Sequence, residues 1–178
     1  MSEFQDETEL IGALMGLPIF ADLDYADIEK LLNICERYEV EAGAALCEPD
    51  TIDENLTIFL GGKLRLETRE GDKLADVTQL RVIGEMGVFT GQPRSSRVLA
   101  EQTSDVLVLQ GAALKDLAEE NPDLGAKMLS NLLKLLYERT HDTNDHIQEL
   151  QEKLDQLTQR LSELAPDDPL LASSAEGT

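Results

Sequence analysis

The sequence predicts an α+β protein that is mainly β: an antiparallel β-roll, or jelly-roll barrel, flanked by short N-terminal helices and followed by a long C-terminal coiled-coil helix. Apolar residues recur every three or four positions at the start of the chain, alternate in its middle, and follow a heptad in its last third. The expected parts are N-terminal helices (1–37), a β core (38–111), a short helix with the long helix (112–164) and a disordered acidic tail (165–178).

Two short helices are expected before residue 38. Pro18 and the Asp22-Leu23-Asp24 turn separate them. Their apolar positions are Leu10, Ile11, Leu14 and Met15, then Leu23, Ile28, Leu31, Leu32 and Cys35. Cys35 and Cys47 show no CxxC spacing, so we expect two reduced thiols that pack in the core rather than a metal or redox pair.

The β core consists of short alternating stretches with turn signals every eight to twelve residues, which is typical of a small antiparallel roll. One such turn is Gly61-Gly62. The expected strands cover 38–40, 45–47, 56–60, 64–68, 74–80, 97–101 and 106–109.

The last third predicts a short helix over 113–119 and, after Asn121-Pro122-Asp123, one long heptad seam. Its a and d positions are Leu129, Leu133, Leu136, Thr140, Thr143, Ile147, Leu150, Leu154, Leu157, Leu161 and Leu164. At 1.5 Å per residue this seam spans roughly 50 Å, more than a small barrel can cover, so its distal half needs a partner helix.

The residues that flank the seam favour a parallel homodimer. Position g holds Arg139, His146, Lys153 and Arg160, whereas position e holds neutral residues. An antiparallel pair would place like charges opposite each other, and a parallel pair opposes g to neutral e. The two threonine layers either fix the register of this dimer or mark a place where a ligand touches it.

The charge is unevenly distributed. The net charge is −21, and residues 1–60 carry 2 Lys/Arg against 15 Asp/Glu, whereas residues 61–111 carry 7 of each. A nucleic-acid partner is therefore not expected, because phosphate backbones need a dense basic face. An acidic N-terminus and the lack of any apolar run of about 18 residues favour a cytoplasmic protein without a membrane association.

One segment in the neutral part of the chain contains the groups that an anion needs. Gly84 permits a tight turn, Met86 to Phe89 could form one helical turn with free amides, and Ser95-Ser96 add hydroxyl and backbone donors. Arg94 can grip two oxygens of a phosphate with its planar fork, and Glu85 can accept hydrogen bonds from a sugar hydroxyl. The combination suits a nucleotide.

This segment resembles the phosphate-binding cassette of cyclic-nucleotide-binding domains, the family of the catabolite activator protein, protein kinase A regulatory subunits and cyclic-nucleotide-gated channels. The family pattern is Gly-Glu, a short helix, then Arg-Ser/Thr-Ala-x-Val-x-Ala. The chain matches it with Gly84-Glu85, Met86 to Phe89, Arg94-Ser95, Val98 and Ala100, and has Ser96 where Ala is usual. The resemblance extends over roughly residues 10 to 140. Asp50 replaces a frequent turn glycine, and the loop before Ile83 is about two residues short.

The resemblance implies a role for each matched residue. Gly84, Glu85 and Met86 would lie at the ribose side of the ligand, and Arg94 and Ser95 would bind the cyclic phosphate. Ser96 would pack where Ala does, and its amide could help the phosphate. The long helix would cover the base and place Arg139 and Thr140 at the purine, although Arg139 could equally be a solvated g residue.

The resemblance implies a cyclic-nucleotide sensor without any other cofactor, with cyclic AMP as the first choice and cyclic GMP as the second. Such a homodimer would signal through a protein effector. The competing interpretation is a ligand-free scaffold that has kept the roll and the coiled coil. An enzyme is not expected, because no nucleophile elbow or phosphate loop occurs, and His141 and His146 lie five residues apart, which is unsuited to a two-histidine metal face.

Overall fold

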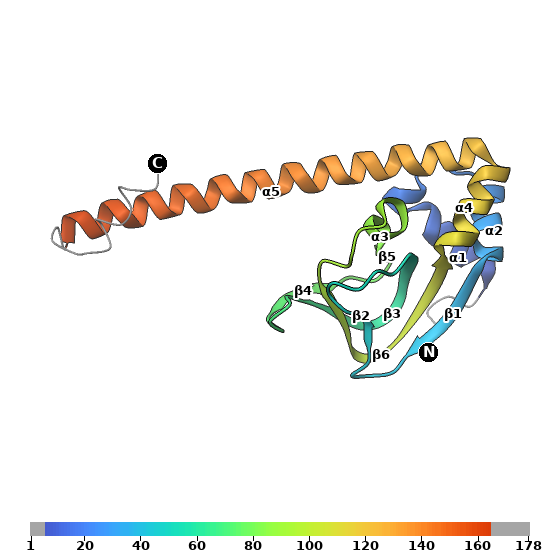
Figure 1. Cartoon of the computed structure of the whole chain (residues 1–178), viewed down its shortest axis with the longest axis horizontal. Coiled ribbons are helices and arrows are strands. Elements are labelled where there is room, and N and C mark those ends of the chain that lie inside the picture. Colours follow the sequence, from blue (N-terminus) through green and yellow to red (C-terminus); the bar gives the residue numbers. More distant parts are fainter. Residues whose placement is uncertain (1–5, 165–178) are drawn as a thin grey trace. The chain divides into compact units, whose positions relative to one another are not determined.

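The computed structural model describes residues 6–164 as two compact units, which divide between Leu133 and Lys134. The first unit holds a six-stranded antiparallel sheet, and helices precede and follow its strands in the sequence (Figure 1). The second unit continues the long helix. The predicted acidic tail, 165–178, lies outside the described residues. The predicted fold class, a β-roll with flanking helices and a long C-terminal helix, is confirmed.

The N-terminal segment folds as two helices with a single 3-10 turn between them. Their bounds are α1 Glu7–Met15, η1 Pro18–Phe20 and α2 Tyr25–Asn33. An aspartate precedes each of these two α-helices as its N-cap, where a carboxylate accepts a backbone N–H of the first turn. Asp6 accepts from the Glu9 amide at 2.7 Å and Asp24 from the Asp27 amide at 2.9 Å.

The sheet has the strand order β1-β6-β3-β4, with β2 added to β6 and β5 added to β3. The strand bounds are β1 Cys35–Val40, β2 Ala45–Cys47, β3 Asn55–Glu67, β4 Lys73–Val77, β5 Arg81–Ile83 and β6 Arg97–Gln110. Two strand predictions differ from this result. β3 and β6 are each continuous where two strands were expected, because bulges around Gly61 bend β3 without ending it. Gly62 has φ +106, and a Cβ there would overlap Ser104 of β6.

Two further predictions were wrong. Cys35, expected in a helix, begins β1 opposite Leu109 of β6, because α2 ends at Asn33. The strand expected over 74–80 ends at Val77, and Leu80 adopts φ +54 before the short strand β5. The chain therefore turns between β4 and the short strand that follows it.

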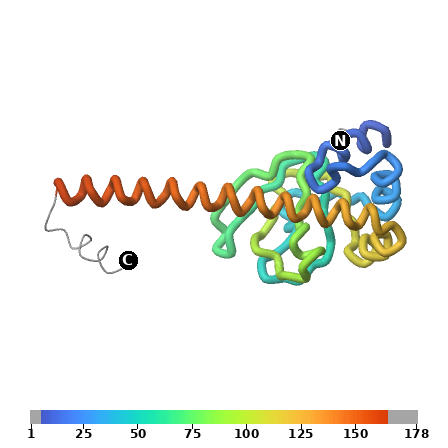
Figure 2. The backbone as a smooth tube through the Cα atoms, turned by 90° about the horizontal axis from the view of Figure 1, so that it is seen from above, coloured from blue at the N-terminus to red at the C-terminus, as the bar shows by residue number. Residues whose placement is uncertain are grey.

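Three helices complete the described chain: α3 Glu85–Thr90, α4 Gly111–Glu120 and α5 Pro122–Leu164. α1, α2 and α4 gather at the same end of the roll (Figure 2). There they share one apolar core with the start of β3, the end of β6 and the first turns of α5. A second core lies between the strands and contains Phe59, Leu64, Val98, Ala100 and Val106. Both family-pattern residues, Val98 and Ala100, are thus core residues.

The first turns of α5 use one face for this core and leave another face exposed. Leu124, Met128, Asn131 and Leu132 are buried. The seam residues Leu129 and Leu133 are 50% and 61% exposed. The predicted seam is therefore not used for packing within the first unit.

The second unit is the uninterrupted helical stretch 134–164, as the heptad predicts. Both seam threonines bond within the helix. Thr140 Oγ1 donates to the Leu136 carbonyl at 2.8 Å and Thr143 Oγ1 to the Arg139 carbonyl at 2.7 Å. Each hydroxyl is thereby satisfied locally.

Candidate functional site

The candidate site is built around α3, which follows β5 directly. Gly84 precedes the helix with φ +89, in the left-handed region that favours glycine. A Cβ at Gly84 would overlap the Arg94 guanidinium, and one at Gly87 would lie 2.7 Å from the Asp53 carbonyl oxygen. The two glycines therefore let the guanidinium and the backbone of residue 53 approach α3.

Arg94 is fixed through its backbone to the segment before β3. Its amide donates to the Thr51 carbonyl at 2.9 Å, and its carbonyl accepts from the Asp50 amide at the same distance. These two bonds hold the residue on both sides of its Cα. The side chain therefore starts from a defined position although it lies in a connecting segment, which ordinarily varies more than a strand.

The Arg94 side chain is buried, and the residue is 7% exposed. One nitrogen, Nη2, donates to Asp53 Oδ2 at 2.7 Å and to the Asn55 carbonyl at 2.6 Å. The other two, Nε and Nη1, are buried without a hydrogen-bond partner. Buried polar groups are almost always paired, because an unpaired one loses its bonds to water without replacement. This guanidinium therefore has unused donors for an anion.

Asp53 and Asn55 belong to the site but were missed by the sequence analysis. Asp53 uses both oxygens, since Oδ1 accepts the Asn55 amide at 2.9 Å while Oδ2 binds Arg94. The pair Asp53-x-Asn55 at the start of a strand could have indicated a self-bonded turn. The sequence offers no signal that this turn meets an arginine 41 positions later.

The other cassette residues differ in how far they are exposed to solvent. Glu85 is buried in the first turn of α3, and Met86 next to it is exposed. Ser95 is exposed and Ser96 is half-buried. The Ser96 carbonyl accepts the Cys47 thiol at 3.6 Å, and burial raises the pKa of that thiol. Gly84 and Arg94 are thus brought together at the start of α3, whereas Met86 and Ser95 are exposed.

Arg139 and Thr140 belong to the second unit and are described with it. Arg139 is half-buried, and the Thr140 hydroxyl donates within its own helix. Their assignment to a purine stays a prediction.

The departure at Asp50 has a structural explanation. Asp50 adopts φ +62, the conformation that a turn glycine takes without strain and that Asp tolerates better than most residues. Its carboxylate forms an ion pair with Arg69. The turn thus keeps the shape that the family glycine implies.

Other parts of the described chain add little chemistry. A groove of about 560 Å³ opens between β1, β3 and β6, and residues 37–39, 61–62 and 102–105 line it. It contains no cassette residue. Among residues 6–164, no group of His, Cys, Asp and Glu is arranged to hold a metal ion. None of the helices in that range is both long and apolar enough to cross a bilayer.

The comparisons with known proteins agree with this geometry. The family model described as the cyclic nucleotide-binding domain matches residues 37–121. An uncharacterized NTE family protein of Mycobacterium tuberculosis is 29% identical over 129 residues, which are 72% of this chain but only 22% of that protein. The chain thus spans about a fifth of the length of this curated relative.

Solved structures show the same fold. A cyclic nucleotide-binding domain from Methylobacillus flagellatus KT is 27% identical with a TM-score of 0.69, and the match covers 80% of this chain and 82% of that one. The catabolite activator protein of Thermus thermophilus is 22% identical with a TM-score of 0.65, over 76% of this chain and 63% of its own. Residues 37–121 therefore match the model of the cyclic nucleotide-binding domain, and the fold around them is that of these solved structures.

Proposed function

We propose that this chain is a non-enzymatic regulatory sensor that binds a cyclic nucleotide, cyclic AMP in preference to cyclic GMP. It acts in the cytoplasm as a parallel homodimer and passes its signal to a protein partner. One observation supports the assignment of an anionic ligand: Nε and Nη1 of Arg94 are buried beside Gly84 without an acceptor. An anionic phosphate supplies acceptors of the right charge for such a fork.

Different residues around Arg94 bind different parts of the nucleotide. Arg94 holds the phosphate oxygens through its two unused nitrogens while Asp53 keeps Nη2 in place. Ser95 and the Ser96 amide add donors to the phosphate. Glu85, buried at the start of α3, accepts a hydrogen bond from the ribose. Arg139 and Thr140 are the candidates for contacts to the base.

The proposed signal starts at the Arg94–Asp53 pair. A bound phosphate adds negative charge beside an arginine that is already paired, which changes the balance of charge at the segment 50–55. The bound base in turn biases the packing of the long helix, and the partner protein responds to that change.

The homodimer is supported by exposed apolar surface. Within 134–164, Ile147, Leu150, Leu154 and Leu157 remain about half or more exposed, all at a or d positions. Because a lone helix with such a stripe is unfavourable in water, a second copy with the same seam is the simplest cover.

The test is calorimetric titration of the purified chain with cyclic AMP and with cyclic GMP. We expect saturable binding of one nucleotide per chain, with cyclic AMP tighter, and loss of binding in Arg94→Ala. The matched control is Arg69→Ala, since Arg69 is exposed and pairs with Asp50 on the same segment. Equal binding by Arg94→Ala and wild type would overturn the assigned site.

A ligand-free scaffold is the second candidate, and the Arg94–Asp53 pair favours it. Asp53 already neutralises the guanidinium charge at 2.7 Å, as a phosphate otherwise would. If neither nucleotide binds at high micromolar concentration after copurified ligand is removed, while sedimentation still shows a dimer, the scaffold is the correct function.

A further inference from the structure

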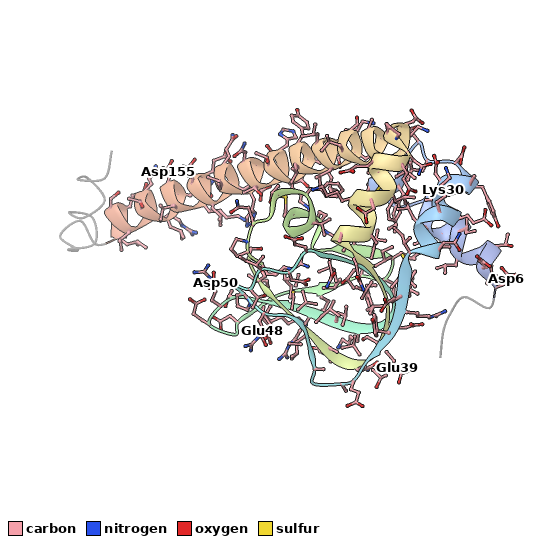
Figure 3. All side chains as sticks on the ribbon, turned by 45° about the vertical axis from the view of Figure 1, so that its right-hand side comes forward. Asp6, Lys30, Glu39, Glu48, Asp50 and Asp155 are labelled. Atoms are coloured by element: carbon pink, nitrogen blue, oxygen red, sulfur yellow. The ribbon has the colours of Figure 1, made fainter. Side chains whose placement is uncertain are left out.

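Acids outnumber bases by more than two to one in the first unit, to which the proposed anionic ligand must bind. Residues 6–133 contain 11 Lys/Arg and 25 Asp/Glu. The acids are spread over many elements, as the labels on Asp6, Glu39 and Glu48 in Figure 3 show. Charges of one sign repel a ligand of the same sign over about one Debye length, roughly 8 Å at physiological salt and 30 Å at 0.01 M. A nucleotide therefore approaches this surface against repulsion unless a nearby cation offsets it.

The arginine of the site does not by itself offset that repulsion. Nη2 of Arg94 and Oδ2 of Asp53 lie 2.7 Å apart, so the two opposite charges largely cancel when seen from a distance. Glu85, which follows Gly84, is a further acid of the site. Nε and Nη1 of Arg94 can hold a phosphate that has arrived, but the neutralised pair attracts one only weakly from solution. An unpaired cation close to α3 would supply the missing attraction.

Arg81 is such a cation. Arg81 and Lys115 are both exposed, and neither forms an ion pair with any residue in the described range 6–164. The other nine bases of residues 6–133 all form ion pairs: Lys30, Arg37, Lys63, Arg65, Arg69, Lys73, Arg94, Arg97 and Lys127.

The position of Arg81 is close to the site and fixed by the sheet. Arg81 begins β5, three residues before Gly84, and three residues of extended chain span at most about 11 Å between Cα atoms. The Leu80 amide donates to the Phe59 carbonyl at 2.8 Å, and Phe59 pairs with Arg81 across the sheet. No acid occurs in residues 77–84 or among the β3 residues that pair with β5. The charge of Arg81 is therefore held near α3 without an acid beside it in either strand.

Arg81 also lies on the face of the sheet that leads to the cassette. Residues opposite each other in antiparallel strands share a face, and so do residues two apart in one strand. Phe59, opposite Arg81, belongs to the second core, and Ile83 packs against the same core. Cys47 packs there as well, and its thiol donates to the Ser96 carbonyl. β5 thus places the unpaired charge on the side where the second core meets the cassette.

We propose that Arg81 steers the anionic phosphate of the nucleotide towards Arg94 and thereby sets the rate at which the ligand binds. This inference rests on the proposed function, since it assigns a further residue to the same site. Arg81 acts through its charge before the phosphate reaches Arg94, which holds the phosphate afterwards. A charge at the rim of a site changes the association rate constant and its dependence on salt, and it leaves the dissociation rate constant nearly unchanged.

The test measures by stopped flow how fast fluorescently labelled cyclic AMP binds to the full chain and dissociates from it. Arg81→Gln removes the charge, and Arg81→Glu reverses it. At about 0.01 M salt we expect association rate constants lower by roughly threefold and roughly tenfold, because the Debye length then exceeds the distance to the site. At about 0.15 M salt and above, both differences should shrink, because the charge is screened.

Lys115→Gln and Lys115→Glu are the matched controls. Lys115 is the other exposed base without an ion pair in the described range, and it lies on α4, outside the cassette. Its substitutions change the net charge by the same amounts, so we expect association close to that of wild type. Thermal melts verify that all four variants fold. Equal association rate constants in the Arg81 and Lys115 variants, or an effect of Arg81 on dissociation alone, would overturn the proposal.

The same measurements separate this proposal from the proposed function. Saturable binding of cyclic AMP that does not respond to Arg81 leaves the sensor standing and removes the steering role. If wild type binds no nucleotide, the sensor itself is wrong, and Arg81 has no ligand to steer.

Discussion

Arg94 and Asp53 form a partly buried ion pair, 2.7 Å between Nη2 and Oδ2, that occupies only one of the three guanidinium nitrogens. The pair orients the arginine and at the same time leaves Nε and Nη1 available. A fully paired arginine at this place would be a structural residue. The partial pairing is what makes it a candidate ligand residue.

Asp53 should stabilise the fold as well as orient Arg94. In Asp53→Ala the guanidinium loses its charged acceptor while it stays buried, so we expect the free energy of unfolding to fall by about 1–3 kcal/mol. Asp53→Asn keeps an acceptor and should lose less. Urea denaturation of both variants measures this difference. Equal losses would mean that the carboxylate charge, not the hydrogen bond, is what matters.

Gly84→Ala should be more damaging than its backbone strain alone explains. The new Cβ would overlap the Arg94 guanidinium, so we expect an unfolding free energy lower by about 1–3 kcal/mol and no nucleotide binding. Gly71→Ala is the matched control, because Gly71 has φ +92 with nothing within 4 Å of an added Cβ. Thermal melts with and without ligand give both quantities. Similar losses in the two variants would argue against the collision.

Removing the seam hydroxyls should tighten the dimer. Thr140→Val with Thr143→Val replaces two hydroxyls that bond only within the helix by methyls that pack at a and d. We expect a lower dimer dissociation constant in sedimentation equilibrium. Ser162→Ala is the control, since Ser162 donates to the Gln159 carbonyl from the outer position b. A weaker dimer in the double variant would show that the hydroxyls contribute to the interface.

Stability should fall at high pH through Cys35. Burial raises the pKa of this thiol to about 12, so the folded state resists forming the thiolate. The contribution of the protonated thiol to the free energy of unfolding is fully present below about pH 9, the ordinary thiol range. Between there and about pH 12 the free energy of unfolding falls by up to ~1.4 kcal/mol per pH unit, because the unfolded state gives up this proton more readily. Between pH 8 and 10.5 the urea midpoint of wild type should fall more steeply with pH than that of Cys35→Ala. Parallel curves would contradict the assignment.

The sequence predicts the parts of this molecule that depend on local pattern. The roll, α3 after Gly84, the position of Arg94 in the cassette and the long heptad helix all follow from residues close together in the chain. Strand continuity does not, because Gly61-Gly62 reads locally as a turn and becomes a bulge only when β6 lies beside it. Nor does Cys35, whose strand pairing is set by Leu109.

Contacts between distant segments are the second feature that the sequence does not predict. Asp53 meets Arg94 across 41 residues, and Asn131 donates to the Ile19 carbonyl across 112. Neither pair has a spacing that a motif can record. The buried Asn131 amide, which also donates to the Ala21 carbonyl, ties the start of α5 to the 3-10 turn η1 through contacts that only the folded chain defines.

Leu132 and Leu133 are neighbours in α5, yet the first is 2% exposed and the second 61%. Successive residues of a helix differ by about 100° around its axis. The burial of Leu132 therefore sets the angle at which Leu133 faces solvent. The same holds one turn earlier, where Met128 is 1% exposed and its neighbour Leu129 is 50% exposed. The first turns of α5 thus give one face to the core of the first unit and leave an apolar neighbouring face to solvent.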